Sequence, residues 1–147
     1  MSDYGSIIGV CENGCLADSG LHNIDGGAVN PATRTMIGKA VRVIAVDSGV
    51  RIVNQEFNAS DNPYGVVLLP IDCGCDPSYE EGEPISVVTC GRVWVSVPYI
   101  NEAPNFMDTV FVLSDGTLSQ HGTPTKWFFT GDFIRRGHGL SLAVVQL

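Results

Sequence analysis

The chain has 147 residues, a length typical of one domain. It carries 16 acidic and 8 basic side chains, and its formal net charge of −8 opposes contact with phosphate backbones, so nucleic-acid binding is not expected. Charged residues make up only 16% of the chain, below the usual value of about a quarter. This low content favours a surface that is partly used for contacts with another protein.

From the sequence we expect neither a membrane helix nor a secretion signal. No apolar run reaches the roughly 18 residues that a membrane span needs. The first five residues, MSDYG, lack the basic flank and apolar block of a signal peptide. We therefore expect folding in a cytoplasm, where reduced thiols are the default for the five cysteines.

Residues 1–35 differ in composition from the rest of the chain. After a short apolar run at 7–10, this part is rich in Gly, Asn, Asp and Ser and poor in large apolar residues. We interpret it as an extended N-terminal arm or a set of loops over the domain surface, with a disordered tail as the alternative.

Short β-strands are predicted from residue 36 onward. Apolar residues alternate over 36–46, a turn signal follows at 47–49, and 50–53 begins the next strand. The continuous apolar run 64–69 ends at a proline and fits a strand that is covered on both faces.

The second half of the chain continues this pattern. A strand region at 84–97 is interrupted by Cys90 and Gly91, which indicate a bend or bulge. Asp115 and Gly116 predict a tight hairpin with a type I′ turn. Further strands are expected at 109–113, 127–130 and 140–146.

No segment shows a sustained helical period, so helix content should be small. The sequence thus predicts an all-β fold. Residues 36–147 should form a single domain, built as a small antiparallel barrel or a jelly-roll-like sandwich and carrying the extended N-terminal arm.

The cysteines are the first candidates for chemistry. Four of them have the spacings C-x-x-x-C and C-x-C and are a weak candidate set for tetrahedral zinc, although neither spacing is the usual knuckle: Cys11, Cys15, Cys73 and Cys75. A disulfide is a second reading. The simplest reading is that all five cysteines are reduced and semi-buried.

No catalytic or cofactor-binding residues are predicted. His22, His121 and His138 lie in no known catalytic motif. The acidic segment 72–83 lacks the spacing of an EF-hand and is read as a solvated loop. Glycine-rich phosphate loops are also absent from the sequence. We therefore expect a protein that is not an enzyme and needs no cofactor.

Trp94 is the candidate interface residue. It alternates with Val93 and Val95, so its side chain should lie on the opposite face of the strand from these valines. If the valines fill the core, Trp94 faces outward, where tryptophan often anchors an interface. The alternative is that the domain covers both faces of the strand and that Trp94 belongs to a core.

Several segments, in this order, resemble the small cement or decoration proteins of tailed-bacteriophage capsids. The segments are 36–40 (MIGKA), 65–68 (GVVL), 82–87 (GEPISV), 91–95 (GRVWV), 108–112 (DTVFV), 115–119 (DGTLS) and 139–145 (GLSLAVV). The resemblance covers about residues 36–147. The cysteines and the acidic loop are not part of this pattern.

This resemblance implies a structural protein on the outer surface of a phage head. It would bind the major capsid protein and other copies of itself, as a dimer or trimer, and stabilise contacts between capsid subunits. The resemblance implies no catalytic residues in this chain. The alternative hypothesis is a receptor- or glycan-binding β domain of a phage tail or surface fibre.

Overall fold

The computed structural model describes residues 13–18, 20–69, 78–98, 102–135 and 141–147. Within these ranges every regular element is a strand, and none of them contains a helix long and apolar enough to cross a membrane. The strands are β1 (Asn23–Val29), β2 (Thr35–Met36), β3 (Ala40–Asp47), β4 (Val50–Asn54), β5 (Gly65–Val67), β6 (Ser78–Tyr79), β7 (Pro84–Cys90), β8 (Arg92–Ser96), β9 (Thr109–Val112), β10 (Leu118–Ser119), β11 (Thr123–Arg135) and β12 (Ser141–Gln146).

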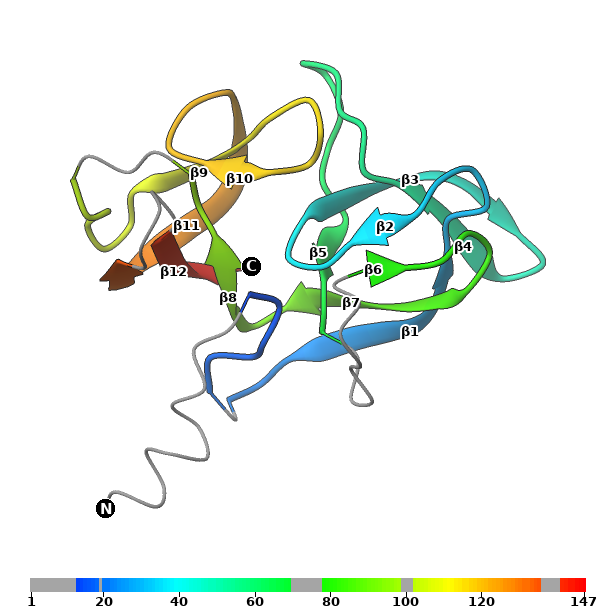
Figure 1. The fold of residues 1–147 in the computed structure, drawn as a ribbon, viewed down its shortest axis with the longest axis horizontal. Coiled ribbons are helices and arrows are strands. Elements are labelled where there is room, and N and C mark those ends of the chain that lie inside the picture. Colours follow the sequence, from blue (N-terminus) through cyan, green and yellow to red (C-terminus); the bar gives the residue numbers. More distant parts are fainter. Residues whose placement is uncertain (1–12, 19, 70–77, 99–101, 136–140) are drawn as a thin grey trace.

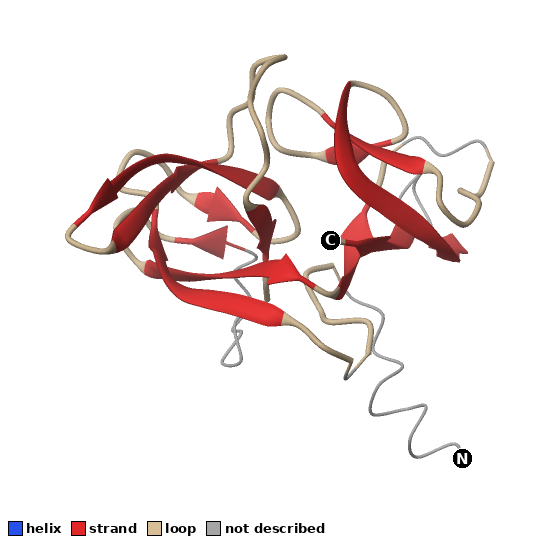
Figure 2. Ribbon diagram, turned by 180° about the vertical axis from the view of Figure 1, so that it is seen from behind, coloured by secondary structure: helices blue, strands red, loops and turns tan. Residues whose placement is uncertain are grey.

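The strands form a closed barrel and a second curved sheet (Figure 1). The barrel has the order β1-β4-β3-β5-β7, and the second sheet has the order β10-β9-β11-β12-β8. Strands β2 and β6 form a separate two-stranded ribbon. Figure 2 shows the barrel and the second sheet side by side from behind. The predicted all-β class is confirmed. The five strands of the barrel lie within residues 23–90.

The chain passes from the barrel to the second sheet at Gly91, between β7 and β8. Gly91 has a φ of 119°, and a Cβ atom at this position would lie 2.7 Å from the Cβ of His22. A residue with a side chain would therefore be strained here and would press on the chain before β1. The bend predicted at Cys90 and Gly91 is confirmed.

The barrel and the second sheet share one hydrophobic core. This cluster takes five residues from the barrel side: Ala40, Phe57, Val66, Leu68 and Val88. From the other side come Val93, Val95, Val97, Val110, Val112, Leu118, Phe129, Ala143 and Val145. A smaller cluster fills the barrel interior. Because the larger cluster is continuous across the two sheets, we expect them to fold as one unit.

The hairpin between β9 and β10 turns in a different way from the predicted type I′. The Gly116 N–H donates to the Leu113 carbonyl over 3.0 Å, and the Leu113 N–H donates to the Thr117 carbonyl over 2.8 Å. Gly116 has a φ of 85°, whereas Asp115 is not among the residues with positive φ. This is a three-residue loop with glycine in the left-handed position, because Asp115 need not leave the ordinary region of φ.

The same hairpin attaches the second sheet to the barrel. The Ala40 N–H donates to the Gly116 carbonyl over 2.8 Å, and the Phe57 N–H donates to the Ser114 carbonyl over 2.9 Å. The Lys39 ammonium lies 3.0 Å from a carboxylate oxygen of Asp115. These contacts reinforce the shared core and fix the second sheet relative to the barrel.

The N-terminal part contains a strand where an arm or loops were expected. Strand β1 pairs antiparallel with β7 and parallel with β4, and it thereby closes the barrel. In this strand Ala28 is the one fully buried apolar side chain. Its membership in the barrel rests on backbone pairing more than on apolar side chains, which explains why its composition resembles a loop. The predicted arm at residues 1–12 lies outside the described residues.

Residues 14–17 also join the second sheet. Leu16 bridges to Val93, the Gly14 N–H donates to the Trp94 carbonyl over 2.8 Å, and the Trp94 N–H donates to the Cys15 carbonyl over 2.8 Å. This segment therefore covers the edge of β8, which would otherwise be open to pairing with another chain.

Candidate interaction surfaces

Trp94 lies on the opposite face of β8 from Val93 and Val95. Those valines belong to the main core, whereas Trp94 packs with Leu142 and Val144 in a separate cluster. Its exposed fraction is 8%, so within this chain the side chain is nearly covered. Its role as an interface anchor stays a prediction, and the exposed apolar side chains lie elsewhere.

The structure describes only part of the cysteine set. Cys11, Cys73 and Cys75 lie outside the described residues, while Cys15 is half-buried beside β8 and Cys90 is exposed at the end of β7. Among the described residues, no group of three or more His, Cys, Asp or Glu side chains is placed to hold a metal ion. The zinc site therefore stays a prediction.

The first exposed apolar surface lies on the β3–β4 hairpin, and we call it the hairpin surface: Ile44 and Val46. The pairing of β3 with β4 shifts between Val43 and Ala45, so Ile44 is the extra residue of a bulge. The last four residues of β3 are all exposed, and Val46 is 64% exposed. The hairpin therefore extends beyond the barrel core and presents apolar side chains to solvent.

An ion pair between β1 and β4 supports the base of this hairpin. The Arg51 Nε donates to Asp25 Oδ2, and the Tyr64 hydroxyl donates to the same oxygen over 2.7 Å. The Gly27 N–H donates to the other carboxylate oxygen over 3.0 Å. The hydrogen bond from Arg51 is the largest cause that lowers the pKa of Asp25 from 3.8 to about 2, against the opposing effect of burial.

This ion pair makes stability depend on pH. Because the pKa of Asp25 is lower in the folded protein than in the unfolded chain, its contribution is complete above the ordinary pKa of 3.8 and is lost as the pH falls toward 2. Asp25→Asn should lower the free energy of unfolding near neutral pH by about 1–2 kcal/mol. Urea titrations between pH about 2 and about 7 should show the difference from wild type shrinking at the acid end.

The matched control is Asp47→Asn, which changes an exposed carboxylate at the end of β3. It should shift the free energy of unfolding by less than about 0.5 kcal/mol. If Asp25→Asn and Asp47→Asn behave alike at every pH, the ion pair does not contribute to stability.

The second exposed apolar surface lies on the loop before β9, and we call it the loop surface: Phe106 and Met107. Phe106 is 65% exposed, and its ring packs edge-to-face against Phe128, with 5.9 Å between the ring centroids. Met107 has a φ of 73°, an uncommon conformation for a residue with a long side chain. Strained backbone of this kind occurs often at binding sites.

The loop surface is held firmly in this conformation. The Met107 N–H donates to the Phe129 carbonyl over 2.9 Å, and the Phe129 N–H donates to the Asp108 carbonyl over 2.8 Å. Asp108 also accepts the Asn105 N–H over 2.8 Å through its side chain. The two apolar side chains are thus presented on a fixed turn.

The two surfaces lie at opposite ends of the molecule. The turn between β3 and β4 and the segment that precedes β9 are at the two ends of the longest axis in Figure 1. One belongs to the barrel and the other to the second sheet. Sequence reasoning missed both surfaces, because exposure of an apolar residue depends on tertiary packing.

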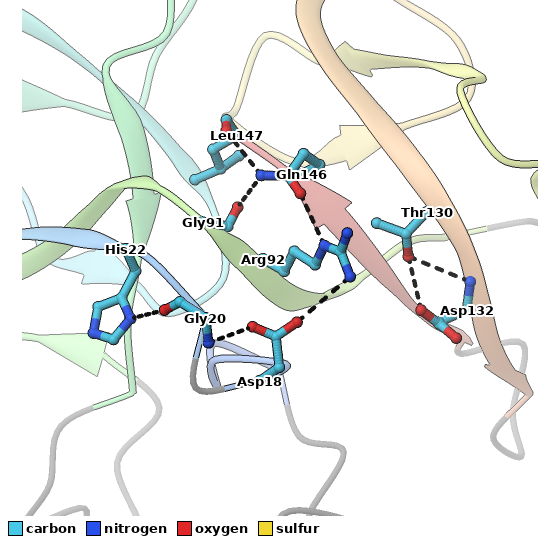
Figure 3. Close-up of polar contacts among 9 residues, drawn as sticks. All are labelled: Asp18, Gly20, His22, Gly91, Arg92, Thr130, Asp132, Gln146 and Leu147. Atoms are coloured by element: carbon cyan, nitrogen blue, oxygen red, sulfur yellow. Dashed lines mark hydrogen bonds and ion pairs between the residues drawn. The ribbon is translucent and has the colours of Figure 1, made fainter.

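Polar contacts around Arg92 join three parts of the chain at the edge of the second sheet (Figure 3). Its guanidinium donates to the Gln146 side chain over 2.9 Å and lies 3.5 Å from the Asp18 carboxylate. The Gln146 amide in turn donates to the Gly91 carbonyl over 3.3 Å. Arg92 and Asp18 are both about half exposed, so this network contributes modestly to stability. Neither its chemistry nor its exposure indicates catalysis.

An all-β domain with two separate exposed apolar surfaces offers places for contact with other proteins. The model of the family described as XM1 gp53 minor capsid protein matches residues 1–147. The chain therefore belongs to this family of phage minor capsid proteins, and it is a structural component of the virion. The predicted relationship to phage capsid proteins is confirmed.

The fold is also similar to that of a chain in a solved structure, "The capsid of Myoviridae Phage XM1". The TM-score is 0.64 at 18% sequence identity, and the match covers 92% of this chain and 88% of that chain. At this identity the likeness concerns the fold. No curated protein matches the sequence.

Proposed function

We propose that this protein is a cement protein, which binds the outer surface of a phage head and stabilises contacts between major capsid subunits. Membership of a minor capsid protein family supports a role within the capsid. The observation that carries the finer proposal is the placement of the hairpin surface and the loop surface at opposite ends of one rigid molecule.

Two contact surfaces on one rigid body suit a clip between neighbouring subunits. When one surface has bound, the other is held near its own target, so the second contact forms at high effective concentration. The core shared by the barrel and the second sheet keeps the distance between the two surfaces fixed. Many copies, each as part of a dimer or trimer, would bind one head. Together they would stabilise the capsid against the internal pressure.

Cosedimentation with expanded capsids that lack this protein tests the proposal. We expect saturable binding at a fixed ratio to the major capsid protein, followed by a higher temperature of capsid rupture. Binding without a higher rupture temperature would contradict cementing, and absence of binding would contradict the proposal as a whole.

A groove between the barrel and the second sheet favours a second candidate function, the recognition of a host glycan. Its lining combines apolar rings with an amide and an ammonium group: Asn62, Pro63, Pro124, Thr125, Lys126 and Trp127. An aromatic ring beside hydrogen-bond donors is a suitable surface for a sugar ring. Retention of the free protein on host envelopes, lost in Trp127→Ala, would favour this function over cementing.

A further inference from the structure

The outer face of the second sheet near the loop surface carries a groove. Its lining residues come from β9, β11 and the flanking loops, and all except Phe129, whose side chain is buried in the core, are at least partly exposed: Glu102, Asp108, Thr109, Phe111, Gln120, His121 and Phe129. Val110 and Val112 of β9 point into the core, so Thr109 and Phe111 alternate to the outer face. Phe128 pairs with Thr109 on this face and supports the ring of Phe106. The groove thus lies beside a row of aromatic side chains.

The charges around this groove have one sign. Among the lining residues that the structure describes, Glu102 and Asp108 are carboxylates, and none is a lysine or an arginine. The carboxylate of Asp108 is already used by the Asn105 N–H. Glu102 is exposed, and its backbone carbonyl accepts a hydrogen bond from the Gln120 side chain. The carboxylate of Glu102 takes no part in that hydrogen bond. Glu102 is therefore the carboxylate that is available to a partner.

We propose that this face docks a basic segment of the major capsid protein, in which a lysine or arginine stands next to an apolar side chain. The cation would lie at Glu102, and the apolar side chain would pack on Phe106 and Met107. A second copy of this chain fits poorly, because it would bring a second acidic groove against the first and both chains carry a net charge of −8. Charge complementarity favours a basic partner.

This inference rests on the proposed binding to capsids, and it adds which face binds and what the face recognises. The test compares Glu102→Lys with Glu81→Lys in binding to expanded capsids that lack this protein. Glu81 is exposed in the turn after β6, so both variants make the same change in net charge. We expect Glu102→Lys to weaken binding about tenfold or more and Glu81→Lys to change it less than about twofold.

Salt provides a second readout. Wild-type binding should weaken as ionic strength rises, and the binding of Glu102→Lys should depend less on salt. Phe106→Ala, which removes the apolar anchor and leaves the charges, should weaken binding while it keeps the salt dependence of wild type. If wild type binds and both lysine variants bind equally well, the docking face is wrong while the cement function stands. If wild type does not bind, the proposed function fails first.

Discussion

Phe129→Ala is expected to lower the free energy of unfolding by about 3–5 kcal/mol, the largest stability change of the substitutions proposed for this chain. Phe129 is fully buried and is the largest side chain in that state. It stands in the core that the barrel and the second sheet share. Removing its ring leaves a cavity between the two sheets, because a close-packed core collapses only partly. Urea titration of wild type and variant measures the loss.

The control for this prediction is Phe106→Ala, the same chemical change at a side chain that is 65% exposed. It should lower the free energy of unfolding by less than about 1 kcal/mol. Both tryptophans lie at 94 and 127, in the second sheet, so their fluorescence reports that sheet while circular dichroism reports all strands. Transitions that coincide would support one folding unit, whereas separate transitions would show that the shared core does not couple the two sheets.

Sequence reasoning predicted the strands whose side chains alternate or form apolar runs. The regions 36–46, 84–97 and 109–113 all contain strands, and the change of sheet falls at Gly91. These predictions succeed because each depends on a local pattern that burial imposes on neighbouring residues. The choice between barrel and sandwich stayed open, because it depends on which strands pair across the whole chain.

Strand β1 shows where local patterns fail. Its sequence, NIDGGAV, has few large apolar residues, and its pairing with β7 shifts between Asn23 and Ile24 and again between Asp25 and Ala28. The contacts that hold it come from β4 and β7, which lie far away in the sequence. The cluster of Asp25, Arg51 and Tyr64 has the same origin, since three separate segments supply its members and form no motif.

Trp94 shows a different limit. Alternation along β8 places its side chain on the face away from Val93 and Val95. Alternation does not reveal what covers that face, and in this chain Ala17 and Ile134 pack against the Trp94 cluster. The exposed apolar residues instead lie where a hairpin and a strained turn extend beyond the core, and this is a property of tertiary structure.

The second large effect concerns the hairpin surface. Replacing Ile44 and Val46 together with serine is expected to weaken binding to expanded capsids about 10- to 100-fold. Both side chains are only partly exposed in the free protein, so covering each of them in an interface contributes about 0.7–1.4 kcal/mol. The loss of both, about 1.4–2.7 kcal/mol, corresponds to a 10- to 100-fold change in binding. Both residues are already exposed, hence the free energy of unfolding should change by less than about 1 kcal/mol. Binding isotherms by cosedimentation and urea titrations measure the two quantities.

The control is Leu21→Ser, since Leu21 is 97% exposed and belongs to neither surface. An equal loss of binding in Leu21→Ser would mean that apolar exposure in general, and not the hairpin surface, governs attachment.

The rupture temperature distinguishes the linking of two subunits from simple attachment to one. If the hairpin and the loop surface contact different subunits, the double serine variant, when added at saturating concentration, should still decorate capsids through the loop surface. It should nevertheless fail to raise the rupture temperature, because a protein that is bound through one surface does not link two capsid subunits.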